Sequence, residues 1–108
     1  FLLFVAYSFF FLSFFIFWCR LLFFFLVEGV GGWCVPLSEQ LMLKDLANAI
    51  NLPIIMVARI GLGCINHSLL TIDKIKQDSN LYHGWIANPI DPNYPDIESN
   101  IQAIADRS

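Results

Sequence analysis

Three short segments contain residue types that could bind a charged ligand. Glu28 precedes the glycine-rich residues 29–32, so its carboxylate lies beside backbone that a ligand can approach closely. Such a carboxylate can hold Mg²⁺ directly or through water. Residues 61–66 contain Gly-x-Gly before a helical pattern, and free N–H groups at a helix start suit an anion. Asn88 has an amide that could donate to and accept from a purine edge.

Each segment also has a plainer interpretation. Glu28 could be a solvated loop glutamate, residues 61–66 a tight turn capped by Asn66, and Asn88 a turn residue before a proline. His67 and His83 have no metal-ligand partner at suitable spacing, so both are interpreted as structural. The sequence contains no G-x-x-x-x-G-K-[ST] phosphate loop and no pattern of a Ser/His/Asp or Cys/His triad.

The surrounding patterns predict alternating strands and helices. Apolar runs predict buried strands at 21–27, 53–58 and 83–88. Apolar residues at helical spacing predict a helix over 39–50 with Ser38 as its N-cap, a second helix from the 61–66 turn to Asn80, and a third over 96–106. This order predicts an α/β domain with a mainly parallel sheet and flanking helices. Ligands bind such sheets beyond the carboxyl ends of the strands, where all three segments should lie.

The first 25 residues differ in composition from the rest of the chain. All 11 Phe fall within residues 1–25, which we therefore separate from an α/β domain over residues 26–108. Phe1 to Cys19 has no charge over 19 residues, a length that would allow a membrane anchor. Alternatively, its residue types share codons that begin with T, as translated non-coding or frame-shifted DNA would produce. A first residue other than Met indicates a fragment.

Charge and cysteine content exclude several classes of protein. The net charge is -3, and no run of Lys or Arg offers the positive field that nucleic-acid binding requires. Cys19, Cys34 and Cys64 form no C-x-x-C pair, which argues against a disulfide framework or a zinc site. We expect buried or incidental thiols in a reducing cytosol and therefore a cytoplasmic protein.

The motifs taken together resemble those of the dethiobiotin synthases. The resemblance covers roughly residues 26–90 and depends on Val27–Trp33 with Pro36-Leu37, on Gly61–His67 and on Gly84–Asn88. It implies a P-loop NTPase-like fold, a homodimer and an ATP- and Mg²⁺-dependent ligase of biotin biosynthesis. Such a ligase closes the ureido ring of dethiobiotin from 7,8-diaminononanoate and CO₂. One substrate amine captures CO₂ as a carbamate, ATP phosphorylates the carbamate, and the second amine attacks the mixed anhydride.

The resemblance also implies roles for single residues. Glu28 would bind Mg²⁺ and take part in catalysis, and Asn88 would contact the adenine. The nucleotide would lie beside Glu28, Gly29, Val30 and Gly31. The substrate carboxylate, in the active site of the neighbouring subunit, would be held by Gly63, Cys64, Ile65 and Asn66. In this family the phosphate loop and catalytic lysines lie in the first half, which this chain lacks, so we expect the isolated chain to be inactive.

Two other functions remain open at this point. One is a membrane-anchored, non-catalytic interaction module, for which residues 1–25 would be a genuine anchor. The other is a fragment of a related P-loop ATPase of the partition or cobyrinate-amidation type.

Overall fold

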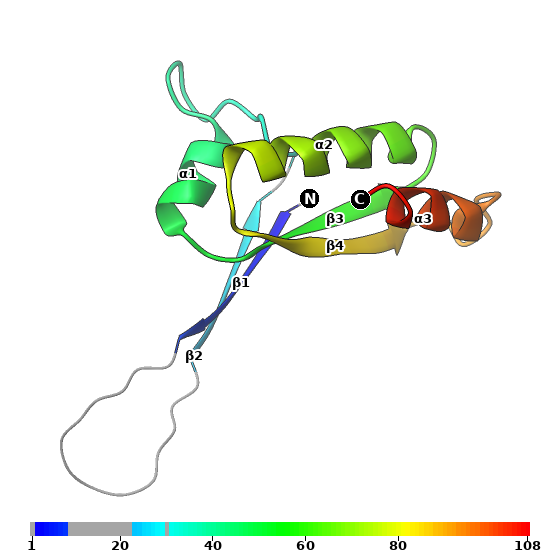
Figure 1. The fold of residues 1–108 in the computed structure, drawn as a ribbon, viewed down its shortest axis with the longest axis horizontal. Helices are drawn as coiled ribbons and strands as arrows, with labels where there is room; N and C mark the ends of the chain where they lie inside the picture. Colours follow the sequence, from blue (N-terminus) through cyan, green and yellow to red (C-terminus); the bar gives the residue numbers. More distant parts are fainter. Residues whose placement is uncertain (1, 9–22, 30) are drawn as a thin grey trace, which may run out of the picture.

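A computed structural model describes residues 2–8, 23–29 and 31–108 (Figure 1). Four strands and three helices follow one another along the chain. Their order is β1 (Leu2–Ser8), β2 (Phe23–Gly29), α1 (Leu43–Ile50), β3 (Ile54–Ile60), α2 (Cys64–Asp78), β4 (Tyr82–Pro89) and α3 (Ile97–Ala105).

The strands form one sheet in the order β2-β1-β3-β4. β3 and β4 are parallel, while β1 is antiparallel to both β2 and β3, so β2, β3 and β4 run in the same direction. The predicted α/β class is confirmed. β1 is the one described strand that runs against the direction of the others. No pattern predicted this strand, which lies within residues 1–25, and β2 crosses residue 25. The domain boundary at that residue stays a prediction.

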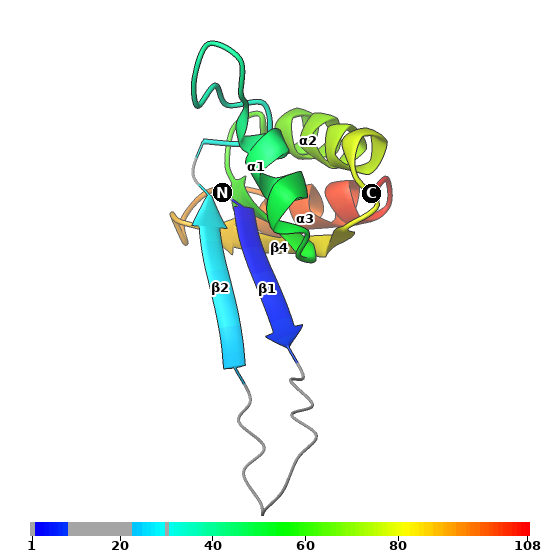
Figure 2. The same ribbon diagram turned by 90° about the vertical axis from the view of Figure 1, so that its left-hand side faces the viewer.

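The β1–β2 pair extends away from the rest of the protein. The two strands pair from Leu2↔Gly29 to Ser8↔Phe23, whereas β1 meets β3 only at residues 2–4. The pair therefore projects beyond β3 (Figures 1 and 2). Within the described residues, no helix has both the length and the apolar character needed to cross a membrane.

The core lies on one face of β3 and β4. Alternate side chains of β3 are buried, as expected where one face of a strand meets helices: Ile54, Met56, Ala58 and Ile60. α2 and α3 contact each other and β3, and Ile72, Ile75 and Ile104 close the core with no exposed surface. On the opposite face, Ile86 remains 47% exposed.

The structure corrects the predicted start of the first helix. α1 begins at Leu43, and its N-cap is Met42 rather than Ser38. The Ser38 hydroxyl accepts the N–H groups of Gln40 and Leu41 within a turn, so it is not available to cap the helix. Instead the Asp45 carboxylate accepts the Met42 N–H at 2.8 Å, which is one half of a capping box. The other helices and β3 and β4 lie close to their predicted positions.

The core predicts a contrast between two positions of α2. Ile72→Ala should lower the free energy of unfolding by about 2–5 kcal/mol, because Ile72 is fully buried and truncation leaves a cavity. Leu70→Ala, at a side chain that is 61% exposed, should change it by about 0.5 kcal/mol or less. Urea unfolding of both variants tests this, and equal losses would contradict the proposed core.

Candidate functional site

The carboxyl ends of β3 and β4 form the edge at which the predicted site should lie. Ile60 is opposite Pro89 and Arg59 is opposite Asn88 in the parallel pair. The turn between β3 and α2 follows immediately at Gly61. Parallel pairing therefore brings the turn and Asn88 to the same end of the sheet, as the sequence predicted.

The turn before α2 leaves backbone donors free at the helix start. Gly63 is the N-cap in the left-handed region, with φ 82°, and the Cys64 N–H donates to the Gly61 carbonyl at 3.0 Å. The N–H groups of Ile65 and Asn66 bond no acceptor within residues 2–8, 23–29 and 31–108. Together with the dipole of a 15-residue helix, these donors favour a negatively charged group.

His67 lies against the backbone of this turn. Its N–H donates to the Gly63 carbonyl at 3.0 Å, and a Cβ built at Gly63 would lie 3.1 Å from Cε1 of His67. A side chain at this position would therefore be both strained and crowded. The conformation of the turn requires glycine here.

A cavity of about 370 Å³ lies between α2 and β3. One wall is formed by residues 56–59 of β3, and Gly61, Leu62 and Gly32 lie at its border. The α2 wall is formed by Cys64, His67, Ser68 and Thr71. Among the described residues, no Asp or Glu lines the cavity, and its charged or polar side chains are those of Arg59, His67, Ser68 and Thr71.

The sequence predictions missed most of the residues on the α2 wall. Of that wall only Cys64 was a predicted site residue, and His67 was interpreted as structural. The missed signal was helical spacing, because residues 64, 67, 68 and 71 are three or four positions apart and share a face.

Glu28 lies near the carboxyl end of β2, but it is level with the start of β3 and does not line the cavity. Glu28 is opposite Leu3, which is opposite Ile55, whereas Asn88 is opposite Arg59. The offset is four residues along the strands, or roughly 13 Å. Glu28 is exposed and Gly29 is buried. No group of three His, Cys, Asp or Glu side chains suited to a metal occurs among the described residues.

The other predicted residues are divided between two places. Gly31, with φ 98°, packs near Val35, while its neighbour Gly32 reaches the cavity. Val30 lies outside the described residues. Asn88 is exposed and borders a second hollow with Val57, Arg59 and Ile90. The Gly63 turn and Asn88 thus share one end of the sheet, whereas the expectation that Glu28 lies at the same end is wrong, because the register places Glu28 level with Ile55.

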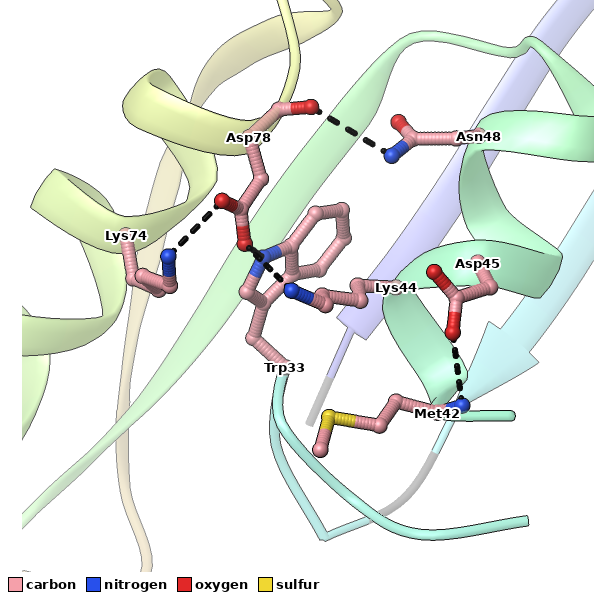
Figure 3. A network of polar contacts seen from close by, with 7 residues as sticks. All are labelled: Trp33, Met42, Lys44, Asp45, Asn48, Lys74 and Asp78. Atoms are coloured by element: carbon pink, nitrogen blue, oxygen red, sulfur yellow. Dashed lines mark hydrogen bonds and ion pairs between the residues drawn. The ribbon is translucent and has the colours of Figure 1, made fainter. Parts of the chain in front are cut away.

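A polar network fixes the loop that follows β2. The Trp33 indole is 3% exposed, and its Nε1–H donates to Oδ2 of Asp78 at 3.0 Å. Lys74 Nζ approaches the other carboxylate oxygen at 2.8 Å, and Lys44 Nζ lies 3.4 Å from Oδ2 (Figure 3). Asn48 donates to the Asp78 carbonyl. One carboxylate at the end of α2 therefore holds both α1 and the glycine-rich loop.

Charge-assisted hydrogen bonds stabilise this carboxylate in its ionised form. The bond from Lys74 contributes most to lowering the pKa of Asp78 to about 2, and bonds from Trp33 and Lys44 add to it against partial desolvation. The same Asp78 bond raises the pKa of Lys74. The network therefore remains charged throughout the neutral range.

This network predicts acid-dependent stability. The pKa of Asp78 is lower in the folded protein than its ordinary value of 3.8, so its stabilising effect is complete above that value. The effect should be lost as the pH falls from about 4 toward 2. Asp78→Asn should destabilise the protein at neutral pH and remove that part of the acid dependence.

Urea unfolding of both proteins at several pH values measures this difference. Asp45→Asn is the matched control, because its carboxylate caps α1 and contacts neither lysine. Parallel stability profiles for the Asp78 variant and the unmodified chain would contradict the assignment.

The chain is similar in sequence to a known domain family and to several known proteins. Residues 22–108 match the AAA domain family. The chain is 46% identical over 82 residues to the ATP-dependent dethiobiotin synthetase of Cellvibrio japonicus, covering 76% of this chain and 36% of that protein. It is 51% identical over 81 residues to the protein of that name from Xanthomonas campestris pv. campestris strain 8004. That match covers 75% of this chain and 36% of the relative. The resemblance seen in the motifs is thus confirmed, and the chain spans 36% of the length of these relatives.

Proposed function

The chain belongs to the AAA domain family, and on that basis we propose that it is part of a cytoplasmic, ATP-dependent dethiobiotin synthetase. The observation that carries the proposal is the 46–51% identity to proteins of that name across three quarters of the chain. The reaction would close the ureido ring of dethiobiotin from 7,8-diaminononanoate, CO₂ and ATP. Catalysis of this kind depends on charge neutralisation at the phosphates and on placement of the two amines.

Glu28 is proposed to hold Mg²⁺ beside the nucleotide. Its exposed carboxylate ends β2, next to a glycine-rich turn that a nucleotide could approach. Mg²⁺ usually keeps several waters and needs only one or two carboxylates in addition to phosphate oxygens, so a single glutamate fits it. When bound, the ion would neutralise charge on the phosphates. Gly29, Val30 and Gly31 would border the nucleotide.

The start of α2 is proposed to hold the substrate carboxylate. The N–H groups of Ile65 and Asn66, which bond no acceptor among the described residues, supply donors, and the left-handed Gly63 and buried Cys64 fix the turn that aims them. In a homodimer this turn would serve the active site of the neighbouring subunit. A carboxylate placed there would fix the distance of the two amines from the phosphates.

Asn88 is proposed to contact the adenine. It is exposed at the end of β4 beside Arg59, so its amide is accessible to a base. The following Pro89 has no N–H, which leaves recognition to side chains and carbonyl groups.

The proposal predicts activity only when the rest of the enzyme is present. The isolated 108-residue chain should form no dethiobiotin, because its sequence contains no phosphate loop. A single chimeric polypeptide, in which residues 27–108 replace the matching stretch of the Cellvibrio japonicus enzyme, should be active. Mass spectrometry of dethiobiotin formed from 7,8-diaminononanoate, bicarbonate and ATP measures both. Turnover by the isolated chain, or a folded but inactive chimera, would refute the proposal.

The same chimera tests the role of Glu28. Glu28→Gln should reduce Mg²⁺-dependent turnover by roughly tenfold to a hundredfold at limiting Mg²⁺, because an amide is a weaker ligand for a hard cation. Glu39→Gln, at an exposed glutamate away from the sheet ends, is the matched control. A titration of rate against Mg²⁺ that is the same for Glu28→Gln and its control would contradict the assignment.

A further inference from the structure

The glycines of the loop after β2 have little that fixes their own position. Gly31 and Gly32 have positive φ values of 98° and 115°. Among residues 2–8, 23–29 and 31–108, neither glycine takes part in a backbone hydrogen bond. A Cβ built at Gly32 would meet nothing within 4 Å, so the space beside it is open. The conformation of this turn therefore depends on what holds its two ends.

The two ends of the turn are held in different ways. At the first end, Gly29 is paired with Leu2 in the sheet. At the second end, Trp33 is 3% exposed and packs in the core. Its Nε1–H donates to Oδ2 of Asp78 at 3.0 Å (Figure 3). A buried indole N–H needs an acceptor, so this hydrogen bond favours one orientation of the ring.

The next attachment of the loop lies two residues beyond Trp33. There the Val35 carbonyl accepts the Leu43 N–H at 2.8 Å, which connects the loop to the start of α1. Between these two points Cys34 is exposed. Trp33 is therefore the fixed residue nearest to the glycines.

Asp78 is itself held by two helices. Lys74 of α2 lies 2.8 Å from one carboxylate oxygen, and Lys44 of α1 lies 3.4 Å from the other. The Asp78 side chain is 17% exposed. Charge-assisted bonds from both sides restrict where the carboxylate can lie, so it presents Oδ2 to the Trp33 indole in one place.

Gly32 connects this hydrogen bond to the candidate site. It lines the cavity of about 370 Å³ between α2 and β3, and it directly precedes Trp33 in the chain. A rotation of the indole would move the peptide that joins the two residues. Asp78 lines neither hollow, so any effect that it has on the border of the cavity is transmitted through Trp33.

We propose that Asp78 is a positioning residue for nucleotide binding, which through the Trp33 indole holds residues 29–32 in the conformation that the nucleotide requires. The inference rests on the proposed function, in which this turn borders the nucleotide. Without the hydrogen bond the turn adopts several conformations, and only the competent fraction binds ATP. The apparent affinity for ATP falls by that fraction. The turnover of the bound complex is unchanged, because ATP selects the same conformation.

Kinetics of the single-chain chimera test this role. Trp33→Phe keeps an aromatic ring but removes the donor, and Asp78→Ala removes the acceptor. Each should raise the KM for ATP by about threefold to tenfold, the range that the loss of one hydrogen bond allows. The kcat should stay within about twofold of the unmodified chimera. The double variant should show no further rise in KM, because both substitutions remove the same interaction.

Ile72→Val is the matched control for lost stability. It shortens a fully buried side chain of the same helix and leaves the Trp33–Asp78 hydrogen bond in place. Its KM should equal that of the unmodified chimera. An unchanged KM in both single variants, an equal rise in the control, or multiplying effects in the double variant would overturn the proposal. Should Asp78→Ala fail to fold, Trp33→Phe decides.

NMR of the 108-residue chain gives a second measurement that does not require catalysis. In Asp78→Ala the Trp33 indole N–H should exchange with water about tenfold faster or more, and the order parameters of Gly31 and Gly32 should fall. Identical values in the two proteins would refute the link. A folded but inactive chimera would refute the proposed function. An active chimera whose variants keep the KM for ATP would refute only the positioning role.

Discussion

The arrangement of this protein depends on the parallel pairing of β3 and β4 through α2. Parallel strands cannot be joined by a tight turn, so the chain must return along the sheet, and α2 performs that return. The helix is held to the sheet because Ile72 and Ile75 pack with Ile54 in a core closed to solvent. This pairing brings the Gly63 turn and Asn88 to one end of the sheet. The positions of the Gly63 turn and of Asn88 therefore follow from the packing of α2 on the sheet.

Asp78 extends this constraint to the glycine-rich loop. The loop contains glycines with positive φ at residues 31 and 32, so its own sequence does not fix its position. Trp33 follows directly, and its buried indole is held by the carboxylate at the end of α2. Because lysines from α1 and α2 bond the same group, that carboxylate stays ionised and the connection is maintained. A glycine turn that borders the cavity is thus followed immediately by a side chain that is fixed to the end of α2.

Sequence patterns predicted the parts of the fold that are set by local periodicity. β3 and β4 follow apolar runs, and α2 and α3 follow apolar residues at helical spacing, so all four lie close to the predicted ranges. β1 was not predictable, because its place depends on pairing with distant strands rather than on its own composition. The same pairing sets the offset of Glu28. Ser38 failed as an N-cap because a local turn used its hydroxyl first.

The candidate site divides in a similar way. The Gly63 turn and Asn88 could be located from sequence, because both follow strands whose direction the pattern predicts. Helical spacing places His67 and Ser68 on one face of α2, but it does not tell a face that packs in the core from one that lines a cavity, so their position beside the cavity required the structure.

Only one face of the sheet formed by β3 and β4 is covered. Helices cover one face of β3 and β4, while the other face exposes Ile86 and Ile90, and β3 keeps an edge that no described strand completes. Parallel sheets are normally buried on both faces, so a domain built this way needs further structure against it.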